Sequence, residues 1–178
     1  MGVVTKEQLS GMGYEDFIKI FGNVIEHCAL CSAAVWAKRP FNDLKQLHSA
    51  ICTFIDDLPK IGREGILRLH PDLAGRIAEM GKLTSESSKE QLSAGLNEIT
   101  NKEKSILQSL NDRYKSKFGF PFVICARENK KQAILSGIKA RVENDKDVEL
   151  ATGIAEVKKI AFYRLLDIIE HCEEEARL

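Results

Sequence analysis

The sequence has no excess of either charge and no long hydrophobic run. Lysine and arginine together number 26, and so do aspartate and glutamate, so the chain carries no electrostatic footprint for nucleic acid or for an anionic membrane. No apolar stretch reaches the length that spans a bilayer. Residues 1–17 contain no apolar region of the kind found in secretory signals. We therefore expect no nucleic-acid partner and no membrane partner.

Internal repeats, low-complexity segments and linker-like stretches are also missing from the sequence. A length of 178 residues suits one domain with one core. With 44% hydrophobic and 29% charged residues, the composition is that of an ordinary soluble protein. The sequence thus predicts a single domain over residues 1–178.

Cysteine occurs five times, without the repeated pairing of a metal-binding framework. An odd count with no secretory signal predicts reduced thiols and an intracellular location. Cys28 and Cys31 form a CxxC motif beside His27, which is typical of a zinc or redox pair. The alternative is two small apolar residues one helical turn apart. Because no second CxxC and no matched histidine pair follows, the alternative is favoured. The other cysteines are Cys52, Cys125 and Cys172.

Almost every segment has the residue pattern of a helix. Thr5 with Gln8, and Thr100 with Glu103, have the spacing of capping boxes, and Asn42 is expected to be an N-cap. Apolar residues recur at spacings of three and four along most of the chain. The main expected helices cover residues 14–26, 28–38, 43–58, 62–69, 89–99, 104–118, 129–143 and 147–174. The fold class predicted is an all-α, compact single-domain bundle of about eight helices.

One short stretch, FPFVICA at residues 120–126, is apolar and β-branched instead. A lone strand is one interpretation, but one strand makes no sheet. Residues 118–126, FGFPFVICA, can offer backbone N–H and C=O groups to a ligand, or can equally be a buried connector. Phe118, Phe120 and Phe122 are expected in the core or in a pocket wall.

His70 stands in RLHPDLAG, residues 68–75, immediately before Pro71. A residue before proline disfavours the helical conformation, so a helix is expected to end near His70. Histidine titrates near neutrality, and a helix C-terminus stabilises its charged form, which suits proton transfer. The alternative is a plain helix end followed by a turn in which Asp72 bonds the backbone. The local pattern alone favours this simpler interpretation.

Ser87 with Glu90, and Ser88 with Gln91, also have the capping-box spacing. A helix start presents unpaired N–H groups and the positive end of the helix dipole, which suit an anion or a polar ring. Glu90 at that place can act as an acid or base, or can orient a histidine. Capping alone explains the same residues and is the more common role.

Arg164 falls within the apolar face of the expected C-terminal helix. At about 100° per residue, the apolar residues from Ile154 to Cys172 lie within about 140° of arc, and Arg164 lies inside it. A guanidinium on a buried face needs an anionic partner. Either an internal carboxylate or a substrate carboxylate held bidentately meets that need, and the pattern does not choose.

Three motifs follow one another in the sequence: HPDLAG at residues 70–75, S-x-x-E-Q-x-x-A-G-L at 87–96, and YKSKFGFPFVICA at 114–126. Together they resemble the OHCU decarboxylase family, where OHCU is 2-oxo-4-hydroxy-4-carboxy-5-ureidoimidazoline. The resemblance runs from about Phe17 to Ile169. Three motifs in the right order are far more specific than any one of them.

The resemblance implies an all-α homodimer that decarboxylates OHCU to (S)-allantoin in urate degradation, with no metal and no organic cofactor. By motif, the catalytic residues are His70, Glu90 and Arg164. Ala176-Arg177-Leu178 resembles a peroxisomal targeting signal, so we expect a peroxisomal location, and otherwise a cytoplasmic one. The substrate is expected to contact Pro71, Ser87, Ser88, Lys89, Glu90, Gln91, Phe122, Val123, Ile124, Cys125 and Ala126.

Two other functions compete with this hypothesis. An all-α, charge-balanced domain can be an adaptor that binds partner helices in an exposed apolar groove. Alternatively, His27, Cys28 and Cys31 can hold zinc for a hydrolytic reaction, although we expect no stoichiometric metal.

Overall fold

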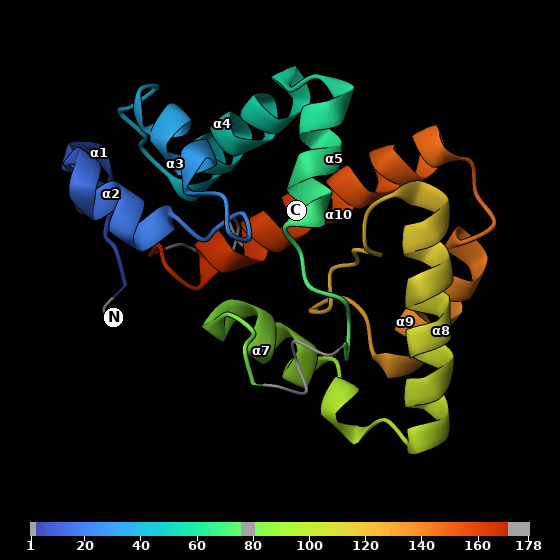
Figure 1. Ribbon diagram of the computed structural model, residues 1–178. Coiled ribbons are helices and arrows are strands. Elements are labelled where there is room, and N and C mark those ends of the chain that lie inside the picture. Colours follow the sequence, from blue (N-terminus) through green and yellow to red (C-terminus); the bar gives the residue numbers. More distant parts are fainter. Residues whose placement is uncertain (1–2, 76–80, 171–178) are drawn as a thin grey trace. The chain divides into compact units, whose positions relative to one another are not determined.

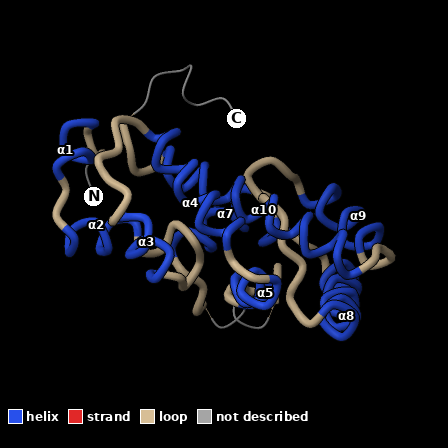
Figure 2. The backbone as a smooth tube through the Cα atoms, turned by 90° about the horizontal axis from the view of Figure 1, so that it is seen from above, coloured by secondary structure: helices blue, strands red, loops and turns tan. Residues whose placement is uncertain are grey.

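The computed structural model describes residues 3–75 and 81–170, and these residues form nine α-helices and one short 3₁₀ helix (Figure 1). Within these ranges no β-strand is present, and Figure 2 draws the backbone as helix and loop alone. An isolated parallel bridge joins Val4 to Ile169. The predicted all-α class is confirmed. Cys172 and the C-terminal Ala176-Arg177-Leu178 lie outside the described residues.

The chain divides into two compact units, Met1–Arg63 with Lys158–Leu178, and Glu64–Val157. The divisions fall within two helices, α5 and α10, rather than in a linker. The expectation of one domain over residues 1–178 stays a prediction.

The first unit is built around a group of short helices, in which α3 packs against both α2 and α4. Thr5 opens the first helix with the predicted capping box, its side chain accepting from the Gln8 N–H while the Gln8 side chain accepts from the Thr5 N–H. Leu47, Ile51 and Ile55 form the buried stripe of the fourth helix. The helices that begin in this unit are α1 (Lys6–Gly11), α2 (Tyr14–Phe21), α3 (Ala29–Trp36), α4 (Leu44–Asp57) and α5 (Lys60–Arg68).

The second unit contains the end of α5 and the beginning of α10, and α8 packs there against α9. The predicted capping box at Thr100 and Glu103 opens α8. Gly119 ends that helix in the left-handed conformation, at φ 81°, which a residue with a side chain rarely adopts. The remaining elements are α7 (Ser85–Ser93), η1 (Leu96–Glu98), α8 (Asn101–Phe118), α9 (Lys131–Arg141) and α10 (Lys146–Leu166).

Two expected helices are shorter than the sequence pattern suggests. The helix expected over 14–26 ends at Phe21, because the Asn23 carboxamide oxygen accepts the His27 N–H and competes with helical bonding. The helix expected over 147–174 ends at Leu166. There the chain leaves the helix to pair with Val4, whose N–H donates to the Ile168 carbonyl over 2.7 Å.

One local expectation was wrong. The N-cap of α4 is Asp43 rather than Asn42, because the Asp43 carboxylate accepts the Gln46 N–H at 2.7 Å. Of the interpretations left open for residues 120–126, the structure has the buried connector, since the stretch is irregular and forms no strand. Phe120 and Phe122 of this stretch, and Phe118 at the end of α8, are buried in the core as predicted, each 1% exposed. No helix in the described ranges combines the length and apolar character needed to cross a bilayer.

Candidate active site

His70 lies two residues beyond the end of α5, as the Pro71 rule predicts, and is 8% exposed. Its Nδ1 lies 3.0 Å from the carbonyl oxygen of Ile66. A carbonyl only accepts hydrogen bonds, so Nδ1 carries a proton and donates. The other ring nitrogen, Nε2, is therefore the atom that gains or loses a proton when His70 titrates. This arrangement fixes the ring and assigns its titratable atom.

The loop that follows His70 is held by side chains of α7 and α8. The backbone N–H of Ala74, a residue in the left-handed conformation at φ 47°, donates to Gln91 Oε1 at 2.9 Å. Asn111 Nδ2 donates to the Leu73 carbonyl at 3.2 Å. Because both contacts come from buried amides, the loop is anchored from two helices.

Asp72 in this loop forms an ion pair with Lys115 of α8, with Nζ and Oδ2 2.6 Å apart. The expected alternative was that its side chain bonds the backbone of a simple turn. The turn exists, since the Gly75 N–H donates to the Asp72 carbonyl oxygen, but that contact is made by the main chain. The carboxylate therefore ties the loop to α8.

The start of α7 lies earlier than the sequence pattern indicates. Thr84 is the N-cap, and its hydroxyl accepts the Ser87 N–H at 3.2 Å. The Ser88 N–H donates to the Thr84 carbonyl. The capping boxes expected at Ser87 or Ser88 were wrong, because Thr84, three residues before Ser87, already takes that position. Residues 87–91 thus lie inside the helix, and the Ser87 and Ser88 N–H groups are engaged within it.

The five residues at 87–91 do not share one environment. Ser87 is 4% and Gln91 6% exposed, one turn apart on the same helix face. Ser88 and Glu90 are half-buried, whereas Lys89 is exposed. The side chains of Ser87, Glu90 and Gln91 are the ones that the helical spacing brings to a common, largely buried face. Their contacts with a substrate stay predictions.

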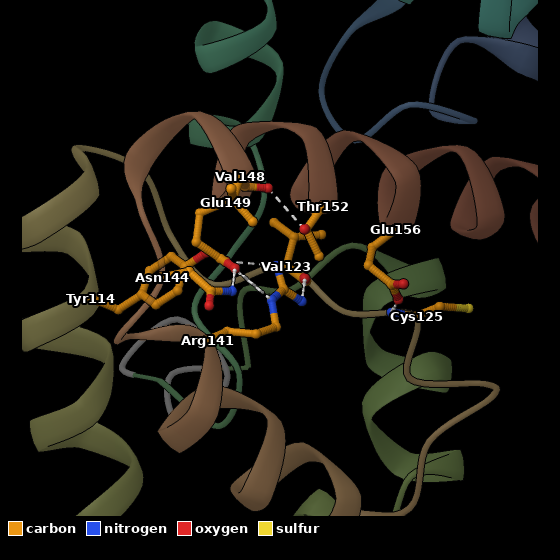
Figure 3. Close-up of polar contacts among 9 residues, drawn as sticks. All are labelled: Tyr114, Val123, Cys125, Arg141, Asn144, Val148, Glu149, Thr152 and Glu156. Atoms are coloured by element: carbon orange, nitrogen blue, oxygen red, sulfur yellow. Dashed lines mark hydrogen bonds and ion pairs between the residues drawn. The ribbon is translucent and has the colours of Figure 1, made fainter.

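Two charged side chains form hydrogen bonds with the backbone of the connector at residues 122–126 (Figure 3). Arg141 of α9 donates through Nη1 to the Val123 carbonyl at 2.9 Å, and Glu156 of α10 accepts the Cys125 N–H at 2.7 Å. The guanidinium also lies over the Phe122 ring, 4.5 Å from its centroid. Burial raises the pKa of the Cys125 thiol to about 11, so this cysteine stays a neutral thiol at neutral pH. Two backbone groups expected to read the substrate are thus used inside the protein.

Arg141 is fixed by a buried carboxylate that sequence reasoning missed. Glu149, fully buried in the first turns of α10, lies 3.0 Å from Arg141 Nη2. It also accepts hydrogen bonds from Asn144 Nδ2 at 2.8 Å and from the Tyr114 hydroxyl (Figure 3). Burial, and then the bond to Glu149, raise the pKa of the Tyr114 phenol well above its usual range. The one signal in the sequence was Glu149 beside Leu150 at a helix start, which capping by acidic residues explains equally well.

Arg164 is buried in the first unit, 3% exposed, as its place in the apolar arc predicts. Its Nη1 lies 2.7 Å from Oε2 of Glu26, which is 1% exposed, and donates to the Asn23 carbonyl at 2.9 Å. The internal carboxylate left open by the sequence therefore exists. Glu26 was missed, although a glutamate directly after the apolar pair Val24–Ile25 was a usable signal. A role for Arg164 in binding the substrate stays a prediction.

The CxxC motif sits at the start of α3. Cys28 is half-buried at the N-cap, whereas Cys31 is 1% exposed, and burial raises its thiol pKa to about 12. The exposed His27 ring lies 3.8 Å from the Glu26 carboxylate. Across residues 3–75 and 81–170, no three His, Cys, Asp or Glu side chains are grouped so as to hold a metal ion. Cys31 is placed as a core residue, in line with the favoured interpretation.

The sequence is similar to characterised proteins over most of its length. It is 49% identical over 160 residues to 2-oxo-4-hydroxy-4-carboxy-5-ureidoimidazoline decarboxylase of Xenopus laevis, covering 90% of this chain and 91% of that protein. To the Mus musculus protein of the same name it is 42% identical over 171 residues, covering 96% of each. The similarity to these relatives extends over almost the whole of this chain.

The fold is also similar to that in the crystal structure of (S)-allantoin synthase, with a TM-score of 0.74 at 24% sequence identity. That match covers 94% of this chain, which spans about half of the other, at 54%. The family model for OHCU decarboxylase matches residues 10–166, a range that includes His70, Glu90 and Arg164. The chain belongs to the OHCU decarboxylase family.

Proposed function

We propose that this protein removes CO2 from OHCU to give (S)-allantoin, a carboxy-lyase reaction of urate degradation. Loss of CO2 leaves an electron pair on carbon, and many decarboxylases need a cofactor to accept it. In OHCU the carboxylated carbon adjoins a ring C=N, so the substrate supplies its own electron sink. The protein then has to orient the ring, help the hydroxyl become a carbonyl, and deliver a proton to one face. No cofactor is required for these tasks.

His70 is the proposed acid and base. The observation that supports it is the Nδ1 hydrogen bond to the Ile66 carbonyl, which holds the buried ring and makes Nε2 the proton-transfer atom. Glu90 keeps His70 or the substrate in register. Arg164 binds an anionic or polar group of the substrate while Glu26 holds its guanidinium.

The His70 assignment is tested with OHCU generated freshly from urate, by following the circular dichroism of (S)-allantoin. We expect His70→Ala to lower kcat/KM by about a hundredfold or more, the usual worth of general acid–base catalysis. His70→Asn is the matched control, because its amide can still donate to the Ile66 carbonyl but cannot shuttle a proton. Near wild-type rates in either variant contradict the assignment.

Arg164 has both a structural and a catalytic hypothesis, and Arg164→Lys separates them. Lysine keeps the charge beside Glu26 but loses the planar, two-pronged donor set. Substrate binding by Arg164 predicts a loss of kcat/KM by at least about tenfold with the melting temperature little changed. Unchanged kinetics with a lower melting temperature would assign Arg164 to the Glu26 ion pair alone.

A homodimer is the proposed assembly, and the peroxisome the proposed location. Light scattering on the purified chain tests the first, and a monomeric mass rejects it. The proposed peroxisomal location is based on Ala176-Arg177-Leu178. A fluorescent fusion with a free C-terminus should enter peroxisomes, and removal of these three residues should leave it in the cytoplasm. Equal distributions of the two fusions reject the signal.

A further inference from the structure

Ile124 differs from its neighbours in the connector. Phe122, Val123, Cys125 and Ala126 are all buried, with exposed fractions of 6% or less, whereas Ile124 is half-buried. Among the described residues, neither the N–H nor the C=O of Ile124 takes part in a hydrogen bond. The N–H and C=O of Phe122 make no hydrogen bond among the described residues either, but Phe122 is 1% exposed. Ile124 is therefore the half-buried residue of this segment that keeps both a donor and an acceptor for a ligand.

The two peptide groups that flank Ile124 are held by opposite charges (Figure 3). The Val123 carbonyl shares its peptide group with the Ile124 N–H, and it accepts from the Arg141 guanidinium at 2.9 Å. The Ile124 carbonyl shares its peptide group with the Cys125 N–H, which donates to the Glu156 carboxylate at 2.7 Å. The two charged contacts therefore act on different sides of one residue.

Both contacts strengthen the hydrogen-bonding groups of Ile124. A cation on the oxygen of a peptide group draws electrons from its nitrogen, so the Ile124 N–H becomes a stronger donor. An anion on the hydrogen of the next peptide group pushes electrons onto its oxygen, so the Ile124 C=O becomes a stronger acceptor. Charge-assisted bonds produce the largest effect of this kind.

We propose that Arg141 and Glu156 are positioning residues that fix and polarise the Ile124 backbone to bind an amide edge, an N–H beside a C=O, on a ureide or hydantoin substrate. The proposal rests on the proposed function, since the ring and ureido group of OHCU and (S)-allantoin carry such edges. Arg141 is itself held by Glu149, Tyr114 and Asn144. Neither residue needs to touch the substrate, because each acts through a peptide group.

Substituting Glu156 gives a cleaner test than substituting Arg141. Glu156 is half-buried, whereas removal of Arg141 would leave the buried Glu149 carboxylate without its cation. With fresh OHCU, Glu156→Ala should raise KM by up to about tenfold, because the hydrogen bond from the substrate to the Ile124 carbonyl is weakened, with a smaller change in kcat. The Kd of (S)-allantoin, measured by calorimetry, should rise by a similar factor. Glu156→Gln keeps an acceptor oxygen without the charge and should recover part of the loss.

Glu143→Ala is the matched control, because Glu143 has a 63% exposed side chain and pairs with Arg113 at the surface of the same unit. Its KM and Kd should equal those of the wild-type protein. A purely structural role for Glu156 would reduce the folded fraction, which lowers kcat and leaves KM unchanged. That outcome, or an unchanged KM and Kd in Glu156→Ala, would overturn the proposal.

Nuclear magnetic resonance tests the polarisation directly in the free protein. The Cys125 amide proton should move upfield in Glu156→Gln, because a charge-assisted bond is replaced by a neutral one. The Ile124 amide should move when (S)-allantoin is added to the wild-type protein. The proposal is refuted if the chemical shift of the Cys125 amide proton stays the same in Glu156→Gln. It is also refuted if the Ile124 amide shift does not change when (S)-allantoin binds. If the wild-type chain makes no (S)-allantoin, the proposed function fails, and the Cys125 shift still decides whether Glu156 polarises this segment.

Discussion

The two buried arginine–glutamate pairs of this molecule resemble each other and do different work. Arg164 with Glu26 lies in the first unit, and Arg141 with Glu149 in the second. Each arginine also donates to a main-chain carbonyl, that of Asn23 in one case and that of Val123 in the other. Only the second carbonyl belongs to a segment expected to meet the substrate. The Arg164–Glu26 pair therefore positions an arginine that is a candidate for substrate binding. The Arg141–Glu149 pair positions the backbone of the segment at Val123.

In the pair of the second unit, Glu149 also accepts hydrogen bonds from Tyr114 and Asn144. Removing one member of a buried pair leaves the other charge desolvated, which costs about 3–5 kcal/mol. We therefore expect Glu149→Ala to lower the free energy of unfolding by about that amount, measured by urea denaturation. This is the largest effect on stability that the comparison predicts.

The double variant Arg141→Met with Glu149→Leu sharpens this prediction. Apolar residues of similar size remove both charges at once, and such replacements are often neutral. If the double variant is much more stable than Glu149→Ala, the loss of unfolding free energy in Glu149→Ala comes from the unpaired Arg141 charge. If Glu149→Ala loses less than about 1 kcal/mol, the network does not carry the stability that its burial implies.

Tyr114→Phe removes a single contact from the same network. The hydroxyl is buried and donates to a carboxylate, a type of hydrogen bond worth about 1.5–3 kcal/mol. Urea denaturation should show a loss in that range, smaller than that of Glu149→Ala because the Arg141 charge stays paired. Tyr14→Phe is the control, since Tyr14 is 47% exposed, and its stability should match the wild type. Equal effects of the two substitutions contradict the assigned contact.

Much of the helical fold was predictable because local chemistry determines it. The capping boxes at Thr5 and Thr100 depend on residues three positions apart, and the helix end before Pro71 depends on adjacent residues. The N-caps of α4 and α7 were misplaced although their contacts are local, because neighbouring residues compete for the same capping position. Other errors arose where distant contacts decide. The shortened end of α10, for example, is set by pairing with Val4, some 160 residues earlier along the chain.

The candidate site shows the same division. Burial of Arg164 followed from one helical pattern, since an arginine inside an apolar arc has nowhere else to lie. Its partner Glu26, and the roles of Arg141 and Glu156, depend on tertiary contacts across 15 or more residues, which no local spacing encodes. Arg141 also lies in the last turn of α9, where a basic residue is ordinary.

Glu64 provides a third carboxylate, buried itself but paired with solvent-exposed cations. Its oxygens lie 2.9 Å from Lys146 Nζ and 2.7 Å from Arg68 Nη2, and the two cations are 46% and 43% exposed. The contact with Lys146, and then that with Arg68, lower the pKa of the Glu64 carboxyl below its usual 4.5. Because the folded-state pKa is depressed, the pairs stabilise the fold above the unfolded-state pKa, and this contribution is lost as pH falls through the folded-state pKa.

Glu64→Gln should therefore be less stable than the wild type at pH 7, with a gap that stays constant down to about pH 5 and closes below about pH 4. Unfolding free energies at a series of pH values measure that gap. Added salt should narrow it, since exposed cations are screened, whereas salt should barely change the cost of Glu149→Ala. A gap that widens on acidification would mean that Glu64 stabilises the fold in its protonated form. Glu64 would then differ in charge state from Glu149 and Glu26, whose carboxylates pair with cations that are shielded from solvent.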